Sequence, residues 1–287
     1  SRSEVAVQAR KSAEGFKPLL NRNLRLIRQW DGNKRAPVSA RVVWRGLSQI
    51  PNSEGKFEMI RLVLTNYYRV SENIKTGPLL QYYIFTDSEF KHMAAPICGD
   101  CPHATAADGK RPACYVQWAR LGHAWNASER NQELSTEKAA QLSKGLRIRL
   151  GSAGDPAAVP MMVWSPILAA ADGHTGYTHQ WDKDWAQPYA GFLMASVDSA
   201  TEAELATAKG WRYFGIETPG KPLQGEFKYS GSNQQPVRCL SEASNIACIN
   251  CMLCNGNANL EKTGKRAPSI VITAHGPGAV NLTARIP

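Results

Sequence analysis

The chain has 287 residues, with 34 Lys and Arg against 24 Asp and Glu, so its formal net charge is +10 and its isoelectric point about 9.3. A content of 43% hydrophobic and 20% charged residues is typical of a globular protein and argues against a disordered tail or a fibre. The sequence has no apolar run of about 18 residues and no apolar segment near its start. We therefore expect a soluble, cytoplasmic protein without a secretory signal.

The predicted elements divide the chain into two parts. Residues 1–75 form a small β-containing extension, with strands over 40–47 and 57–70. Residues 76–287 form an α/β domain in which short apolar strands alternate with helices. Further strands are predicted over 79–85, 146–150, 191–197, 211–217 and 269–276, with the end of another strand over 175–181. Helices are predicted over 117–132, 135–144 and 200–209, a helical or partly buried segment over 161–170, and a polar loop over 225–236.

The boundaries of one helix are marked by specific residues. Ser199 and Glu202 form a capping box before the helix over 200–209, and Gly210 stands where a helix-terminating glycine belongs. The repeated order of strand and helix is typical of a parallel sheet. We therefore expect either a partial or complete TIM-type (β/α) barrel or an open doubly wound sheet, and favour the barrel.

The seven cysteines fall into two groups, and an odd number argues against a disulfide framework. The later group has the spacing C-x8-C-x2-C-x2-C, which suits one tetrahedral Zn²⁺ or one [4Fe–4S] cluster. In a variant of this site, His275 replaces one thiolate and the spacing becomes C-x2-C-x2-C-x20-H. The later ligands are Cys239, Cys248, Cys251 and Cys254.

The earlier group has the spacing C-x2-C-x12-C and comprises Cys98, Cys101 and Cys114, with Tyr115 directly after the third cysteine. Three thiolates leave the fourth position of a metal site to His103, to water or to a substrate. An open position of this kind is what a catalytic centre requires. The alternative is a structural zinc site closed by His103.

Polar residues follow three of the predicted strands. Gly154 and Asp155 come after the strand over 146–150, while His179 and Asp198 follow the strands over 175–181 and 191–197. Loops at the carboxyl ends of parallel strands build the site in such folds, so these side chains should share one mouth. Motifs of dinucleotide-binding proteins, P-loop proteins, serine hydrolases and zincins are missing from the sequence.

The positive charge of the chain favours an acidic partner such as nucleic acid, because Lys and Arg neutralise phosphates and release counterions. The same charge is equally compatible with a surface that serves solubility alone.

The order of a strand, three cysteines with an aromatic residue after the third, a helix, and a strand ending in Gly154-Asp155-Pro156 resembles a radical S-adenosylmethionine barrel. The resemblance implies that Cys98, Cys101 and Cys114 hold a [4Fe–4S] cluster whose open iron binds the cofactor. It also implies that Gly154 and Asp155 hold the cofactor amine and that Tyr115 lies beside it. The spacing departs from the usual C-x3-C-x2-C of that family, and Asp stands where the family has Glu.

A closer similarity, over residues 75–276, is to an uncharacterised phage-encoded cysteine-rich family. It rests on KTGP (75–78), CY (114–115), GDPA (154–157), GYTH (176–179), the late C-x2-C-x2-C and AHG (274–276). A phage-encoded protein would work in the host cytoplasm.

A second resemblance is to nucleic-acid guanine transglycosylases, α/β barrels that include phage enzymes inserting 7-deazaguanines into DNA. It implies that Asp155 and Asp198 act as catalytic carboxylates and that a zinc ion is bound by three late cysteines and a histidine, namely Cys248, Cys251, Cys254 and His275. The earlier cysteines have no role in this reading. A third reading is a non-catalytic nucleic-acid-binding protein with two structural zinc sites.

From these observations we expect a radical-SAM-like metalloenzyme that modifies a nucleic acid or nucleobase. Its catalytic residues would be Asp155, His179 and Asp198, and its first cysteine group would be the catalytic centre. The second group would hold a structural metal or an auxiliary cluster.

Overall fold

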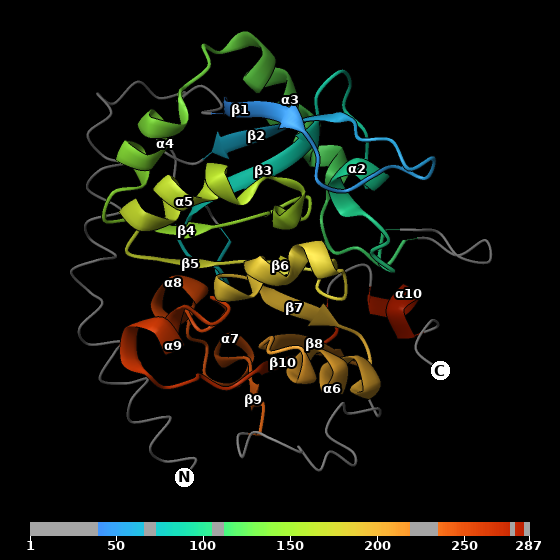
Figure 1. The fold of residues 1–287 in the computed structure, drawn as a ribbon, viewed down its shortest axis with the longest axis vertical. Coiled ribbons are helices and arrows are strands. Elements are labelled where there is room, and N and C mark those ends of the chain that lie inside the picture. The colour runs from blue at the N-terminus through green and yellow to red at the C-terminus, as the bar shows by residue number, and fades with distance from the viewer. Residues whose placement is uncertain (1–39, 66–72, 105–111, 219–234, 276–278, 284–287) are drawn as a thin grey trace.

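A computed structural model describes residues 40–65, 73–104, 112–218, 235–275 and 279–283. Within these residues the strands form two five-stranded sheets, which Figure 1 shows one above the other with helices around them. The chain is therefore an α/β protein, as predicted. Outside the described residues lie the start of the predicted extension (1–39), the end of its second strand (66–70) and most of the predicted loop over 225–236.

The first sheet has the order β1-β2-β3-β4-β5 and is mixed. Its first three strands are antiparallel neighbours, whereas β4 pairs parallel with both β3 and β5. The pairing of β2 with β3 runs from Ile60 opposite Thr86 to Thr65 opposite Gln81, so residues on both sides of position 75 share one sheet. Its strands are β1 (Arg41–Leu47), β2 (Met59–Thr65), β3 (Leu80–Thr86), β4 (Arg147–Arg149) and β5 (Gly173–Thr175).

The second sheet has the order β6-β7-β8-β10-β9 and is parallel throughout. Among the described residues the strand pairing does not close into a barrel, because the strands form two separate sheets with β1 and β5 at the edges of one and β6 and β9 at the edges of the other. The carboxyl ends of β6, β7, β8 and β10 meet at one edge, called here the carboxyl edge. The strands are β6 (Tyr177–Thr178), β7 (Met194–Val197), β8 (Tyr213–Glu217), β9 (Val237–Arg238) and β10 (Ile270–Thr273).

One glycine joins the two sheets. Gly176 lies between β5 and β6, and its carbonyl accepts a hydrogen bond from the Met194 amide at 3.0 Å, while the preceding Thr175 carbonyl accepts from Leu150 at 2.8 Å. A Cβ atom at Gly176 would lie 2.5 Å from a methyl carbon of Leu193, closer than real Cβ contacts. The strand predicted over 175–181 is thus split at Gly176, where a Cβ atom would force the Leu193 side chain to move.

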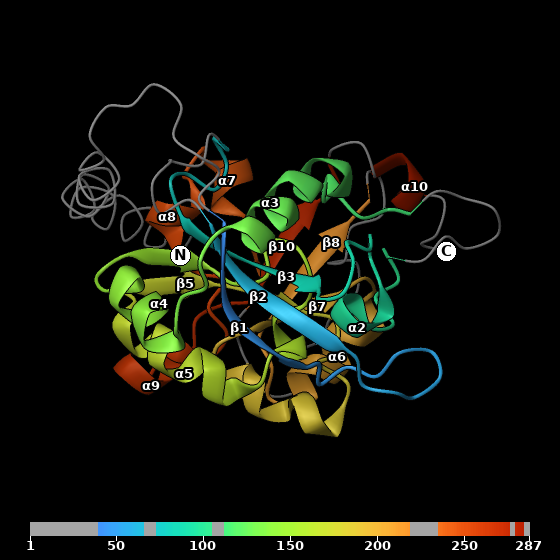
Figure 2. The ribbon, with the colours of Figure 1, turned by 90° about the horizontal axis from the view of Figure 1, so that it is seen from above.

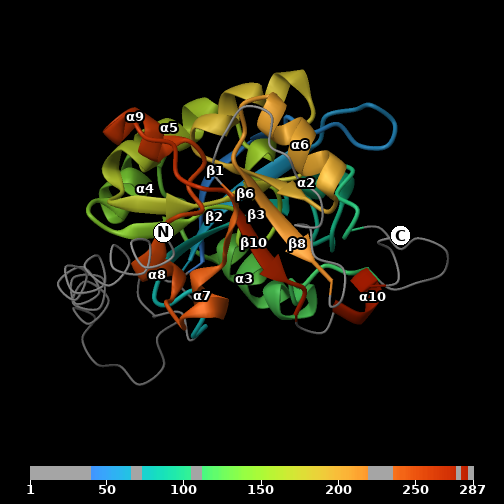
Figure 3. The ribbon, with the colours of Figure 1, turned by 90° about the horizontal axis from the view of Figure 1, so that it is seen from below.

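Helices flank the strands on two sides. Figures 2 and 3, from above and below, place α3, α7, α8 and α10 on one side and α5, α6 and α9 on the other. The α-helices are α2 (Ala95–Cys98), α3 (Trp118–Arg130), α4 (Thr136–Ser143), α5 (Met161–Ala170), α6 (Ala200–Ala208), α7 (Leu240–Ala243), α8 (Cys248–Cys251), α9 (Ala258–Thr263) and α10 (Ala279–Thr283), and the 3-10 turns are η1 (Pro156–Ala158) and η2 (Asp184–Gly191).

The predicted helices α3, α4, α5 and α6 are confirmed to within two residues of their predicted ends. The Ser199 hydroxyl accepts from the Glu202 amide at 3.2 Å, as a capping box requires, and Glu202 in turn accepts from the Asp198 amide at 2.7 Å. The strand predicted from residue 191 instead begins at Met194, because the 3-10 turn η2 extends to Gly191.

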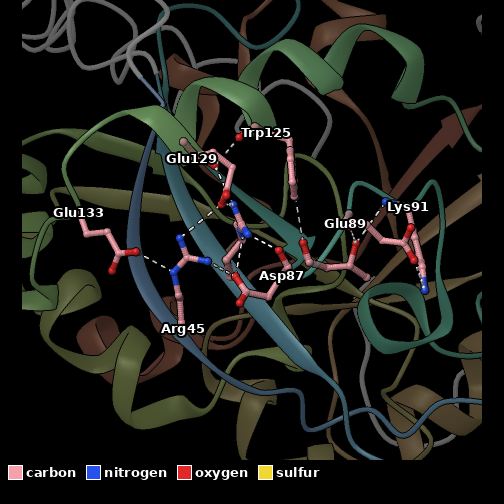
Figure 4. A network of polar contacts seen from close by, with 10 residues as sticks. Arg45, Asp87, Glu89, Lys91, Trp125, Glu129 and Glu133 are labelled. Atoms are coloured by element: carbon pink, nitrogen blue, oxygen red, sulfur yellow. Dashed lines mark hydrogen bonds and ion pairs between the residues drawn. The ribbon is translucent and has the colours of Figure 1, made fainter.

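A buried arginine ties the antiparallel strands to α3. The side chain of Arg61 on β2 is only 2% exposed, donates to Asp87 at 2.9 Å and also pairs with Glu129 of α3. Its guanidinium carbon lies 4.6 Å from the centroid of the Trp125 ring. Figure 4 shows Arg45 meeting the same two carboxylates, so two arginines share this network.

We expect Arg61→Met to lower the free energy of unfolding by about 3 kcal/mol, because it leaves two carboxylates short of a buried partner while Arg45 remains. Urea unfolding followed by tryptophan fluorescence measures the change. The matched control is Lys56→Met, which breaks an exposed ion pair with Glu54 and should change stability by less than about 0.5 kcal/mol. Equal effects of the two substitutions would contradict the role of the network.

Acid should weaken the fold through His174 of β5. This side chain is buried, its Nε2 donates to the Phe192 carbonyl at 2.9 Å, and burial lowers its pKa to about 4. Because the unfolded state then binds the extra proton near pH 6.5, stability from this residue should fall by about 3 kcal/mol as the pH drops from 6.5 to 4. Unfolding measured across this range in wild type and His174→Asn checks this, since the variant should lack that component.

Candidate metal and substrate cavity

A cavity of about 300 Å³ lies against the second sheet, and every cysteine of the chain lines it. Its apolar wall comes from alternating residues of two neighbouring strands, Phe214 and Ile216 on β8 and Ile270 and Ile272 on β10, which face the same side. Because two groups of thiols meet in one space, the cavity is the candidate functional site.

The first thiol group consists of Cys98, Cys101 and Cys114. Cys98 ends α2, the Cys101 amide donates to the Cys98 carbonyl at 3.2 Å, and the Cys114 amide donates to the His103 carbonyl at 3.0 Å. Burial raises the pKa of the Cys98 thiol well above its usual range, and the neighbouring Cys101 and Cys114 raise it further. Such thiols stay protonated and unreactive unless a metal ion displaces their protons.

Next to this group, His103, His179 and Asp198 form what we call the imidazole–carboxylate cluster. His103 Nε2 lies 2.7 Å from one carboxylate oxygen of Asp198, and His179 Nε2 lies 3.7 Å from the other, too far for a hydrogen bond. His179 and Asp198 follow β6 and β7, so the prediction that these strand ends share one edge is confirmed by their distance.

The cluster is strongly polarised. Burial opposes the positive charge on His179, but its interactions with Cys101 and Asp198 outweigh this effect and raise the pKa of His179 well above its usual range. Burial also opposes the charge on Asp198, yet the hydrogen bond from His103 and the nearby charge of His179 lower its pKa strongly. Both shifts favour an ionised Asp198 carboxylate beside the two imidazoles.

Asp155 is bonded to the chain segment that carries His179 of this cluster. One of its carboxylate oxygens accepts from the Ala157 amide at 2.9 Å, and the other accepts from the Thr178 hydroxyl at 3.0 Å and from the His179 amide at 2.9 Å. The preceding Gly154 has a positive φ of 78°, and a Cβ there would lie 2.8 Å from the Ile84 carbonyl oxygen. A cofactor amine at Asp155 would have to share oxygens that already accept hydrogen bonds from the chain.

The second thiol group consists of Cys239, Cys248, Cys251 and Cys254. Burial raises the pKa of Cys251 to about 11 and that of Cys254 further, and in both cases the other thiols of the group add to the increase. This mutual effect shows that four residues spread over sixteen positions lie near one another. Their local elements are α7, which Cys239 caps, and α8, which Cys248 and Cys251 bound.

The segment that carries these thiols crosses the amino ends of several strands. The Cys248 amide donates to the Lys75 carbonyl ahead of β3 at 2.8 Å, and the Gly176 amide ahead of β6 donates to the Cys254 carbonyl at 3.0 Å. Arg212 ahead of β8 donates to the Leu253 carbonyl at 2.8 Å. Most of the second thiol group therefore lies at the amino edge, opposite the imidazole–carboxylate cluster.

Two arginines surround the second thiol group without a carboxylate partner. Arg149 at the end of β4 interacts electrostatically with Cys248, and Arg212 interacts with Cys254 and Cys251. Among the described residues neither arginine forms an ion pair with Asp or Glu; Arg149 donates to the Tyr115 hydroxyl at 2.6 Å. Buried positive charge of this kind stabilises negative charge that develops on nearby thiols.

The sulfur atoms are not arranged around a single point. A tetrahedral zinc ion bound by thiolates requires sulfur atoms about 3.8 Å apart. Among the described residues, no three cysteine sulfurs lie within 4.8 Å of one another. The thiols of the described residues therefore form neither a closed zinc site nor a cluster-like arrangement.

Two other predicted site residues lie apart from the second thiol group. His275 follows β10 at the carboxyl edge, and its Nδ1 donates to the Thr273 carbonyl at 2.9 Å, so it is placed away from Cys254. Tyr115 is 55% exposed and reaches the cavity through its bond to Arg149. Among the described residues, Cys248, Cys251, Cys254 and His275 line the same cavity but do not form a set whose ligand atoms all lie within 4.8 Å of one another.

The sequence did not single out Arg149 or Arg212. It offered His103 only as one of three candidates for the fourth position of the first cysteine site, beside water and a substrate. For Arg149 a signal existed, because Arg147 and Arg149 alternate with Ile148 in a buried strand, which places both arginines on one face. No local signal marks Arg212, whose partners are more than forty positions away.

Comparison with known proteins gives no relatives. No family model matches the sequence, no curated protein is significantly similar to it, and no solved structure matches the fold. Within the described part of the chain, none of the helices has the length and apolar character needed to cross a membrane.

Proposed function

We propose that this chain is a metalloenzyme in which two thiolate-bound metal centres border one substrate cavity. The observation that carries the proposal is that all seven cysteines line the same 300 Å³ space, three beside the imidazole–carboxylate cluster and four beside Arg149 and Arg212. Structural metal sites alone would not need to share a cavity with an apolar wall and buried ionisable groups.

In this proposal Cys98, Cys101 and Cys114 hold a [4Fe–4S] cluster with one iron not bound by cysteine. When bound, such a cluster supplies an electron and an open coordination position, which in a radical-SAM-like enzyme is taken by S-adenosylmethionine. The chain itself orients His179 through Asp155 and keeps bulk water from the thiols by burial. The second thiol group would hold a further metal centre, either structural or an auxiliary cluster.

The proposal includes a partial (β/α) barrel. The strands β3, β4 and β5 of the first sheet pair in parallel, and so do all strands of the second sheet. Gly176 connects β5 to β6 and so joins the two parallel sets. A site at the carboxyl ends of such strands is where barrel enzymes place their chemistry.

The proposed substrate is a nucleic acid or nucleobase. The support is the net charge of +10, of which a large part lies in residues 1–39, with nine Lys and Arg against three Asp and Glu. Binding of a DNA duplex measured between 50 and 200 mM salt tests this, since phosphate contacts weaken steeply over about that range. Salt-independent or undetectable binding would limit the substrate to a small molecule.

The metal proposal is tested by iron, sulfide and zinc analysis, with an absorption spectrum, of protein purified without oxygen. We expect about four to eight iron and matching sulfide per chain and a broad band that bleaches on reduction. Cleavage of S-adenosylmethionine by the reduced protein would then be assayed. One or two zinc ions, no iron and no colour would overturn the iron–sulfur assignment.

A further inference from the structure

The imidazole–carboxylate cluster has a chemistry that differs from both thiol groups. Among the described residues, His103, His179 and Asp198 are the one set of three or more His, Cys, Asp or Glu whose ligand atoms all lie within 4.8 Å of one another. Two imidazole nitrogens and a carboxylate oxygen form the ligand set that first-row divalent metals accept, and three protein ligands leave positions open.

Two atoms of the cluster lack a hydrogen-bond partner and meet only as a long ion pair. His179 Nε2 and the second carboxylate oxygen of Asp198 are both buried, and neither makes a hydrogen bond. They face each other across 3.7 Å, a gap too long for a hydrogen bond and of the size that separates two ligands of one ion. Leaving such atoms unpaired is costly in a folded protein, and a bound cation would satisfy both at once.

The surrounding residues hold the three ligands in place. Asp155 accepts from the amide of His179, and Glu202 accepts from the amide of Asp198 at 2.7 Å. The His103 carbonyl accepts from the Cys114 amide at 3.0 Å. Ligands that come from three chain segments and are each fixed by a second contact are typical of a preorganised metal site.

From this arrangement we infer that His103, His179 and Asp198 bind a divalent transition-metal ion, such as Zn²⁺, Fe²⁺ or Mn²⁺, at the mouth of the cavity. Two neutral imidazoles and one carboxylate leave a net positive charge on the bound ion. His103 and His179 line the cavity, so the open position of the ion faces its interior. The site would bind and polarise an oxygen atom of a ligand there.

The probe for this site is Co²⁺, titrated without oxygen into the protein as purified, with its thiol centres loaded. We expect one Co²⁺ per chain with weak visible d–d bands and without the strong absorption that thiolate ligands produce. His103→Asn, His179→Asn and Asp198→Asn should each weaken Co²⁺ binding by more than about 100-fold, because even supporting residues of metal sites contribute 10- to 100-fold. The matched control is His275→Asn, a histidine that lines the same cavity outside the cluster and should leave binding unchanged.

Several results would overturn the inference. They are the absence of Co²⁺ binding, thiolate-to-cobalt absorption that disappears in Cys101→Ser, and equal weakening by His275→Asn. If a variant does not fold, X-ray absorption of cobalt-loaded wild type decides, since a first shell of nitrogen and oxygen supports the site and a sulfur shell rejects it. The outcome is separate from the proposed function, because His179→Asn should keep its iron and sulfide and Cys114→Ala should keep its Co²⁺ site.

Discussion

Cys114→Ala should abolish the activity and remove the metal of the first thiol group while the chain stays folded. Cys114 lies in the loop before α3 and is one of only three thiols in this group, so its loss leaves too few ligands for a cluster. Iron and sulfide analysis, turnover and a thermal unfolding curve measure the three parts of this expectation. We expect the iron and sulfide content per chain to fall by the amount that one cluster contains.

The two thiol groups serve as controls for each other. In Cys114→Ala the second centre should stay intact, because most of its thiols lie at the amino edge and none is supplied by the first group. Full activity in this variant would disprove a catalytic role for the first group. Loss of both centres together would show that they do not assemble independently.

Cys251→Ala should have the larger effect on stability. Metal bound by four thiolates contributes an apparent 10 kcal/mol or more to folding in small domains, so its loss should lower the unfolding temperature markedly. In addition, Arg149 and Arg212 would lose the negative charge that they face. We expect faster proteolytic cleavage within residues 239–256, measured by limited proteolysis and mass spectrometry.

The same variant distinguishes a metal centre from buried free thiols. A buried cysteine without metal that is replaced by alanine should cost only about 1–2 kcal/mol, with no change in metal content. Unchanged metal and unchanged protease resistance in Cys251→Ala would therefore show that the second thiol group is part of an ordinary core.

The sequence predicted local structure well because local signals decide it. The capping box of Ser199 and Glu202 and the terminating Gly210 placed α6, and the ends of β6 and β7 brought His179 and Asp198 to one edge. Because neighbouring strands are parallel, the polar side chains at their carboxyl ends were predicted to lie together, but the cavity itself was not predicted.

Features that depend on contacts between distant parts of the chain could not be predicted from the sequence. The strand signals at 40–47, 57–70 and 79–85 identified β1, β2 and β3 but not the pairing of β2 with β3, since strand pairing is set by packing between segments. The meeting of both thiol groups in one cavity, and the role of Arg212, follow from contacts across forty or more residues.

The course of residues 248–256 across the amino ends of the strands has a consequence for how the chain folds. The Cys248 amide bonds to the Lys75 carbonyl, and the Gly176 amide bonds to the Cys254 carbonyl, so we expect this segment to dock after β3 and β6 have aligned. Contacts between residues so far apart in sequence form slowly, because closing long loops costs chain entropy. In the proposed function, a metal at the second thiol group would then stabilise a nearly complete structure and would not serve as a folding nucleus.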